Sequence, residues 1–256
     1  MIYITGDTHN TEDMSNLSSR NMKLRCMEQG VDFYDITYAI VLGDFGLPWS
    51  SDCEIDNSGI HPTDHTDRYL LKWYNQKPFK ILAVQGNHDN YDVIKKLPEV
   101  EMFGNKVLKI SDNIFYLKRG EIYCIEEKRF LVLGGAISDD KAWRKPQESW
   151  WEQEEWSEEE KTACLDKIGL CDRKFDYVLS HTGSSAGIAL TDEFFCNEEN
   201  LKQLHRDSNV VFNDKIDSLV VYKKWFFGHL HSDWGYENYD KSKYVPLYHQ
   251  GIVIKQ

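Results

Sequence analysis

Several features that mark membrane, secreted or disordered proteins are missing from this sequence of 256 residues. No apolar run approaches the roughly 18 residues that a membrane-spanning helix needs. The first seven residues have no basic stretch and no small-residue cleavage site, so we expect a strand there and not a signal peptide. No linker, low-complexity tract or fixed-period repeat interrupts the chain, which predicts a single domain over residues 1–256.

The sequence also lacks a closely spaced cysteine pair and has fewer basic than acidic residues. The six cysteines are scattered without a C-x-x-C pair, which favours reduced thiols and a cytoplasmic location. The formal net charge is -12, and an acidic chain repels phosphate backbones and anionic lipids. We therefore expect neither non-specific nucleic-acid binding nor membrane attachment. A phosphorylated substrate stays compatible with this charge, because bound divalent cations reverse the local field.

Short apolar runs alternate with amphipathic segments in the first third of the chain, as in parallel β-α-β units. Closely spaced runs between residues 107 and 133 instead indicate antiparallel strands. Together they predict an α/β fold in which two mixed β-sheets form a sandwich flanked by helices. The expected strands are 2–5, 35–42, 81–85, 107–110, 114–118, 122–126, 129–133, 176–179, 224–227, 244–248 and 252–254, and the expected helices are 12–29, 64–75, 157–168 and 198–206.

Five short polar clusters follow predicted strands and consist almost entirely of residue types that bind metals. Strand ends are where α/β proteins place their chemistry, so the clusters predict a hydrolytic site with two metal ions at one sheet edge. Taken singly, each is weak, because a turn or a structural histidine would look the same. The clusters are Gly6-Asp7-Thr8-His9, Gly43-Asp44, Gly86-Asn87-His88-Asp89, Ser180-His181 and Gly228-His229-Leu230-His231.

The spacing inside these clusters suits shared ions. In an extended chain, side chains two residues apart point the same way, so Asp7 and His9 can bind one ion, and so can His229 and His231. The amide oxygen of Asn87 is a reasonable ligand for a hard or borderline cation. A single carboxylate such as Asp44 can bridge two cations about 3.5–4 Å apart. His88 can donate a proton to a phosphoryl oxygen or a leaving group.

The order of the clusters resembles the calcineurin-like metallophosphoesterase superfamily, including its bacterial and prophage members. Its pattern is Asp-x-His, Gly-Asp, Gly-Asn-His-(Asp/Glu), a single His and Gly-His-x-His, and every part occurs in order between residues 6 and 231. The resemblance implies a four-layer α/β/β/α fold. It also implies hydrolysis of phosphate mono- or diesters by in-line attack of a metal-bridging hydroxide, on a phosphorylated small-molecule or nucleotide substrate.

The same resemblance implies roles for individual residues. His88 and Asp89 would be the catalytic residues. His88 would contact the phosphoryl group and protonate the leaving oxygen, and Asp89 would orient nearby groups. Asn87 would also face the substrate. Two divalent ions are implied, and a mixed nitrogen and oxygen ligand set suits Mn, Fe, Zn, Co or Ni equally. The implied ligands are Asp7, His9, Asp44 and His231 for the first ion, and Asp44, Asn87, His181 and His229 for the second, with Asp44 bridging.

One segment departs from the Ser/Thr protein phosphatases of that superfamily. They carry Gly-Asp-x-x-Asp-Arg-Gly, whereas this chain has Gly-Asp-Phe-Gly-Leu-Pro-Trp at 43–49 and lacks the phosphate-binding arginine. A phosphoprotein phosphatase is therefore the less favoured alternative. A non-catalytic scaffold is less favoured still, because such scaffolds usually lose the Asn-His pair that is present here as Asn87 and His88. A metal-dependent nuclease also stays open.

Two further segments are candidates for setting the substrate. In the loop 134–144, Arg144 or Lys141 can replace the missing arginine, although a surface loop with solvated charges explains the same residues. Four tryptophans lie between residues 143 and 156, and they can stack a nucleobase or form a satellite core, the interpretation that we prefer. The loop 47–63 is a candidate lid. Among the remaining histidines, only His249 lies where a site role deserves a check.

Overall fold

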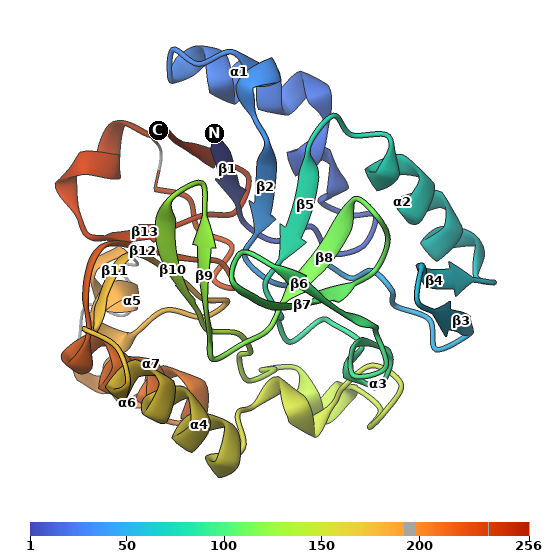
Figure 1. The fold of residues 1–256 in the computed structure, drawn as a ribbon. Coiled ribbons are helices and arrows are strands. Elements are labelled where there is room, and N and C mark those ends of the chain that lie inside the picture. The colour runs from blue at the N-terminus through green and yellow to red at the C-terminus, as the bar shows by residue number, and fades with distance from the viewer. Residues whose placement is uncertain (192–197, 235, 256) are drawn as a thin grey trace.

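The computed structural model describes residues 1–191, 198–234 and 236–255 and arranges them in four layers (Figure 1). Two β-sheets pack face to face, and helices cover the outer face of each sheet. A separate two-stranded hairpin, β3 (Cys53–Asp56) with β4 (Gly59–Pro62), lies in the loop that the sequence offered as a lid. The predicted α/β sandwich of two mixed sheets is confirmed.

The first sheet has seven strands in the order β14-β1-β2-β5-β8-β7-β6. The neighbours β1, β2, β5 and β8 are parallel to one another. At one edge β14 is antiparallel to β1, and at the other β7 is antiparallel to β8 and β6 to β7. The strands are β1 (Ile2–Thr5), β2 (Tyr38–Val41), β5 (Lys80–Ala83), β6 (Glu99–Met102), β7 (Asn105–Lys109), β8 (Ile114–Leu117) and β14 (Gly251–Ile254).

The second sheet has five strands in the order β13-β12-β11-β10-β9, parallel except for β9. The prediction of antiparallel pairing over residues 107–133 holds within the pairs β7-β8 and β9-β10. It is wrong between β8 and β9, because the chain crosses there from the first sheet to the second. The strands are β9 (Glu121–Ile125), β10 (Lys128–Val132), β11 (Lys174–Leu179), β12 (Val221–Phe227) and β13 (Tyr244–Pro246).

Side-chain alternation divides the buried apolar residues among three layers. Along β1, Ile2 and Ile4 face the interior between the two sheets, whereas Tyr3 faces the helices. The inner strands are buried on both faces, which explains why they appear in the sequence as continuous apolar runs. This packing holds the ends of β1, β2, β5, β11 and β12 in place, and the five polar clusters follow these ends.

Helices α1 (Ser19–Glu28) and α2 (His65–Asn75) cover the first sheet, and the helices from α4 onwards lie on the second (Figure 1). The predicted helix over 12–29 is interrupted, because Ser18 is extended and its side chain caps α1 at Asn21. Helix α7 was not predicted. The remaining helical elements are η1 (Met14–Leu17), η2 (Phe33–Asp35), α3 (Tyr91–Ile94), η3 (Lys141–Trp143), η4 (Glu152–Glu154), α4 (Glu158–Gly169), α5 (Ser185–Thr191), α6 (Glu198–Leu204), α7 (Ser208–Leu219) and η6 (Tyr236–Lys241).

Helix α4 begins with a capping box, as the sequence suggests. The Ser157 side chain accepts from the Glu160 amide at 3.2 Å, and the Glu160 side chain accepts from the Ser157 amide at 2.9 Å. We expect Ser157→Ala to lower the free energy of unfolding by about 1 kcal/mol, because amide groups at the helix start lose their partners. Urea unfolding measures this, with exposed Asp166→Asn as the control. An unchanged free energy in Ser157→Ala would contradict the capping role.

The five described cysteines carry free thiols, in line with the expected reduced state, and Cys196 lies outside the described residues. Among the described residues, no helix has both the length and the apolarity that crossing a bilayer requires. The cytoplasmic location stays a prediction.

Candidate metal centre

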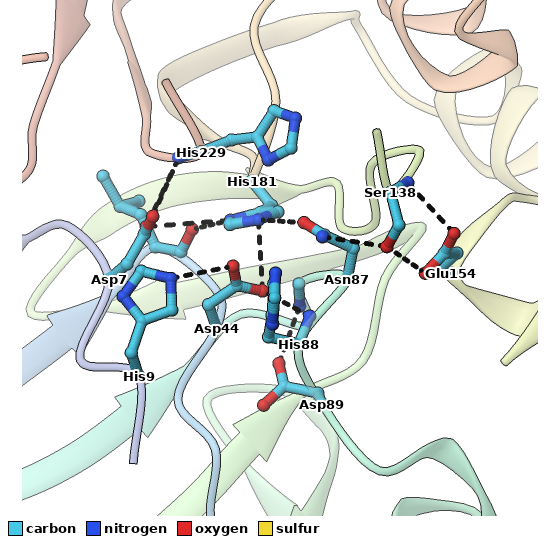
Figure 2. A network of polar contacts seen from close by, with 12 residues as sticks. Asp7, His9, Asp44, Asn87, His88, Asp89, Ser138, Glu154, His181 and His229 are labelled. Carbon is cyan, nitrogen blue, oxygen red and sulfur yellow. Dashed lines mark hydrogen bonds and ion pairs between the residues drawn. The ribbon is translucent and has the colours of Figure 1, made fainter. Parts of the chain in front are cut away.

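The five polar clusters meet at one edge of the sandwich, as Figure 2 shows for their side chains. Each follows the carboxyl end of a strand that is parallel to at least one neighbour: β1, β2 and β5 in the first sheet, and β11 and β12 in the second. The loops from two different sheets therefore face each other across the top of the inner core. This is the arrangement that the strand-end pattern predicts.

Among the described residues, two groups of three side chains lie close enough to hold an ion. The first is Asp7, His9 and His231, and the second is Asp7, Asp44 and His181. In each group, one ligand atom from every residue lies within 4.8 Å of the others. Asp7 belongs to both groups, whereas the family resemblance implies that Asp44 is shared.

Asp44, a member of the second group, also reaches a histidine of the first. One of its carboxylate oxygens is 3.3 Å from Nε2 of His9, and the other is 3.2 Å from Nε2 of His181. Each oxygen thus faces a histidine of a different group. This orientation is compatible with a bridging carboxylate, and the bridging role stays a prediction.

Asn87 and His229 stand next to the second group. The Asn87 amide oxygen is 2.9 Å from Nε2 of His181, so a ligand role is geometrically open to it. The His229 ring lies beside that of His181 with centroids 4.9 Å apart, but neither group of three among the described residues includes it. The backbone amide of His229 instead donates to a carboxylate oxygen of Asp7 at 3.1 Å.

The extended-chain explanation for the His motifs is wrong. His9, His229 and His231 have φ values of 41°, 67° and 50°, in the left-handed region that residues with a side chain rarely adopt. Asp44 is also left-handed, with φ of 48°. Asp7 and His9 do meet, but through this turned backbone. His231 belongs to the first group, whereas the His229 ring lies beside that of His181. Such backbone strain commonly gathers at functional sites.

Two glycines of the motifs leave room for ligands from other strands. A Cβ on Gly86 would lie 2.1 Å from a carboxylate oxygen of Asp44. A Cβ on Gly43 would lie 2.2 Å from Nδ1 of His181, and Gly43 also has φ of 101°. The glycines are thus required by the close approach of the ligand loops, and not only by the turns in which they lie.

The two buried carboxylates have shifted pKa values in opposite directions. Burial raises the pKa of Asp7, and the negative charge of Asp44 acts in the same direction. Burial also acts to raise the pKa of Asp44, but His181 and His9 outweigh it and hold that pKa well below its usual range. Among the described residues, the ion pairs of both carboxylates are with histidines. Two buried acidic groups without a lysine or arginine partner form a setting that favours a bound cation.

His88 lies on the cleft side of the centre, with its ring edge-on to His9 at a centroid distance of 5.6 Å. Its backbone amide donates to Asp44 at 2.7 Å, which fixes the start of the side chain relative to the ligands. Burial lowers the pKa of the His88 imidazole, and the neighbouring Arg144 guanidinium adds to this effect.

Arg144 reaches the site, whereas Lys141 does not. The Arg144 guanidinium contacts both ring nitrogens of His88 and forms an ion pair with Asp140 at 2.8 Å. Its side chain is 7% exposed, so it is held in place and is not a solvated surface charge. The Lys141 ammonium instead lies 4.0 Å from the centroid of the Trp150 ring. Of the two candidates, the geometry favours Arg144 for contact with the substrate.

Asp89 supports the loops of the centre from below. It is buried, and its carboxylate accepts from the amides of Gly46 and Gly86 at 2.8 and 2.7 Å and from the Tyr116 hydroxyl at 2.9 Å. These contacts tie together the loops that carry Asp44 and His88. They are the contacts of a positioning residue, so Asp89 is better described in that way than as a catalytic group.

The tryptophan-rich segment is buried only in part. Trp151 and Trp156 are buried, and their indole nitrogens donate to Asp92 and to the carbonyl oxygen of Gly134. Trp143 is 90% exposed and is not part of this buried set. Two of the four tryptophans are therefore buried, Trp151 against Trp49 and Trp156 in the apolar layer between the second sheet and its helices, and a separate satellite core stays a prediction.

Sequence patterns missed two residues that orient the histidines. Asp13 accepts from Nδ1 of His9 at 2.8 Å and from the Tyr248 hydroxyl at 3.1 Å. The Tyr248 ring stacks on that of His231 at a centroid distance of 4.3 Å. A carboxylate behind a metal-binding histidine fixes the nitrogen that faces the ion. His249 is half-exposed and lies beside Tyr248, 3.3 Å from Asn16, outside both ligand groups.

A cleft of about 980 Å³ opens in front of the centre. His9, His88 and His231 form part of its wall. Acidic side chains and two aromatic rings form much of the rest, and its described lining includes no lysine or arginine. These other residues include Glu12, Asp13, Asp64, Asp67, Glu148, Trp49 and Tyr248.

Comparison with known protein families identifies a match over most of the chain. The family model described as calcineurin-like phosphoesterase matches residues 1–233, which include all five polar clusters. No curated protein matched the chain.

Proposed function

The chain belongs to the calcineurin-like phosphoesterase family, and from this premise we propose that residues 1–256 form a single dinuclear metal-dependent phosphoesterase domain. The family hydrolyses phosphoric esters with the help of metal ions, so the reaction class and a phosphorylated substrate follow from membership. The observation that carries the dinuclear part is the pair of ligand groups that share Asp7.

The donor set fits divalent ions. Carboxylate oxygens and imidazole nitrogens suit Mn, Fe, Zn, Co or Ni, so the chemistry leaves the metal open. We assign Asp7, His9 and His231 to one ion and Asp7, Asp44 and His181 to the other, with Asn87 and His229 beside the second. When bound, the two ions would draw negative charge from the phosphoryl group and make water acidic enough to supply hydroxide near neutral pH.

The chain's own side chains supply the remaining groups. His88 lies at the junction of the ligands and the cleft, where its ring can donate to a phosphoryl oxygen and protonate the leaving oxygen. Arg144 contacts the same ring, and a guanidinium matches the geometry of phosphoryl oxygens. In this way Arg144 would take over the role of the arginine that the segment 43–49 lacks.

The acidic and aromatic residues of the cleft indicate which class of substrate it can accept. Its acidic wall would repel a long phosphate backbone, so a phosphorylated small molecule or a nucleotide is favoured over nucleic acid. Trp49 and Tyr248 offer aromatic faces on which a ring of the substrate can stack.

Hydrolysis of chromogenic esters tests the proposal. Metal-stripped protein would be given an aryl phosphate monoester or its bis-aryl diester, with Mn²⁺ added back. We expect turnover that requires the metal, and the ratio of the two rates identifies the preferred ester class. Titration calorimetry with Mn²⁺ gives the number of bound ions. Absence of turnover with Mn²⁺, Zn²⁺, Co²⁺ and Ni²⁺, despite two bound ions, would contradict the enzymatic assignment.

A further inference from the structure

A buried carboxylate lies behind the metal centre, on the side of Asn87 that faces away from the ligands (Figure 2). Glu154 on η4 is fully buried. One of its oxygens accepts from the Ser138 amide at 3.1 Å and from the Trp150 indole at 2.6 Å. The other accepts from the Ser138 hydroxyl at 2.7 Å. A chain of contacts thus runs from Glu154 through Ser138 to Asn87 and His181.

The surrounding donors determine the direction of these hydrogen bonds. Asn87 Nδ2 and Arg144 Nη1 lie 3.1 and 3.2 Å from the Ser138 hydroxyl oxygen, and both groups can only donate. The hydroxyl therefore accepts twice, and its single proton is left for Glu154. An ionised carboxylate accepts that proton and, on its other oxygen, the two N–H groups. Every polar group in this set is satisfied in only this arrangement.

The same logic fixes the orientation of the Asn87 amide. With Nδ2 held by Ser138, the amide oxygen points to the ligand cluster, 2.9 Å from Nε2 of His181. If the amide turned around, its oxygen would face a hydroxyl whose proton is already donated to Glu154. Its nitrogen, a donor, would then face the place where a cation is expected.

We propose that Glu154, acting through Ser138, is a positioning residue that holds the Asn87 oxygen toward the second ion and Arg144 toward His88. The inference rests on the proposed dinuclear function. It assigns a role to the end of the tryptophan-rich segment, because Trp150 and Glu154 are both part of this contact chain. One serine hydroxyl thereby joins a metal ligand to a substrate contact.

Glu154→Gln is the sharpest test, because the two side chains have nearly the same size. The glutamine carbonyl can still accept from Trp150 and from the Ser138 amide, but its NH₂ group would donate to the Ser138 hydroxyl. That hydroxyl then has to donate elsewhere, and the amide oxygen of a turned Asn87 is the acceptor within reach. We therefore expect the variant to present an NH₂ group to the second ion.

Titration of Mn²⁺ into the metal-free proteins measures the effect without relying on activity. We expect Glu154→Gln and Ser138→Ala to weaken one of the two binding events by about 10- to 100-fold, as is typical for loss of a partner behind a ligand. The other binding event should stay within about twofold of the original protein. Glu152→Gln, on the same short helix but exposed, is the matched control and should leave both events unchanged.

Steady-state kinetics at saturating Mn²⁺ adds a second readout. Because Ser138 also holds Arg144, Ser138→Ala should raise KM for the phosphate ester as well as lower kcat, and Ser138→Thr, which keeps the hydroxyl, should recover most of both. Folded Glu154→Gln and Ser138→Ala proteins that bind both ions with the original affinity would overturn this inference. An unsubstituted chain that binds no Mn²⁺ would overturn the proposed function instead.

Discussion

Replacing His88 with alanine is expected to reduce kcat by about 10²- to 10⁴-fold, the usual contribution of a general acid, while both ions still bind. The ring faces the cleft and belongs to neither ligand group, so its loss removes no metal contact. Its backbone amide, which donates to Asp44, is kept in the variant. Turnover of an aryl phosphate and calorimetric titration of Mn²⁺ measure the two quantities separately.

Substrates with different leaving groups distinguish proton transfer by His88 from phosphoryl binding. An alkyl alkoxide needs a proton more than a nitrophenolate does, so His88→Ala should slow an alkyl phosphate more than a nitrophenyl phosphate. An equal loss for both substrates would assign His88 to binding the phosphoryl group instead of proton transfer. The control is His61→Ala, an exposed residue of the hairpin strand β4, which should leave kcat unchanged. Unchanged turnover in His88→Ala would show that the assigned role is wrong.

For Asp44→Asn we expect the opposite of the His88→Ala result, because the variant should lose metal binding itself. The Asp44 carboxylate is 1% exposed and lies between His9 and His181, so both ion positions depend on its charge. We expect Mn²⁺ affinity to fall by more than about 100-fold, beyond what losing only a partner behind a ligand costs.

Thermal unfolding provides the measurement for Asp44→Asn. A ligand that binds only the folded state raises Tm, so Mn²⁺ should stabilise the original protein and not the variant. Without metal, the variant should be less stable than the original near neutral pH, because His181 and His9 hold the pKa of Asp44 below its usual range and the ionised carboxylate therefore stabilises the folded state. Exposed Asp112→Asn is the control and should keep the Mn²⁺-dependent shift. A full Mn²⁺-dependent shift in Asp44→Asn would rule out Asp44 as a ligand.

The parts of the centre that the sequence predicts are those with a local pattern. Asp7, Asp44 and His181 each follow a continuous apolar run, and a parallel strand buried on both faces has that signature. The helix over 12–29 was only partly right, because an amphipathic pattern does not register that Ser18 adopts an extended backbone and starts a new helix.

The outer partners of the ligands have no such pattern. Tyr248 meets Asp13 across 235 positions, and Ser138 meets Asn87 across 51. No residue spacing predicts contacts between loops that only the packed sheets bring together. The left-handed backbone of His9, His229 and His231 was missed for a related reason, because neighbouring loops impose it against the preference of the residues themselves.

The position of β1 in the first sheet determines at what point in synthesis the ligand groups can form. Strand β1 is made first, but β14 covers one of its edges, and Thr5 bonds to Gln250 across 245 positions. Ribosomes release the chain from the N-terminus, and contacts of such long range form late in folding. Asp7 can therefore contact His181 and His231 only after most of the polypeptide has emerged from the ribosome. A ribosome-bound fragment ending before β12 would lack His231, so the ligand group of Asp7, His9 and His231 is complete only after β12 and the loop that follows it have been made.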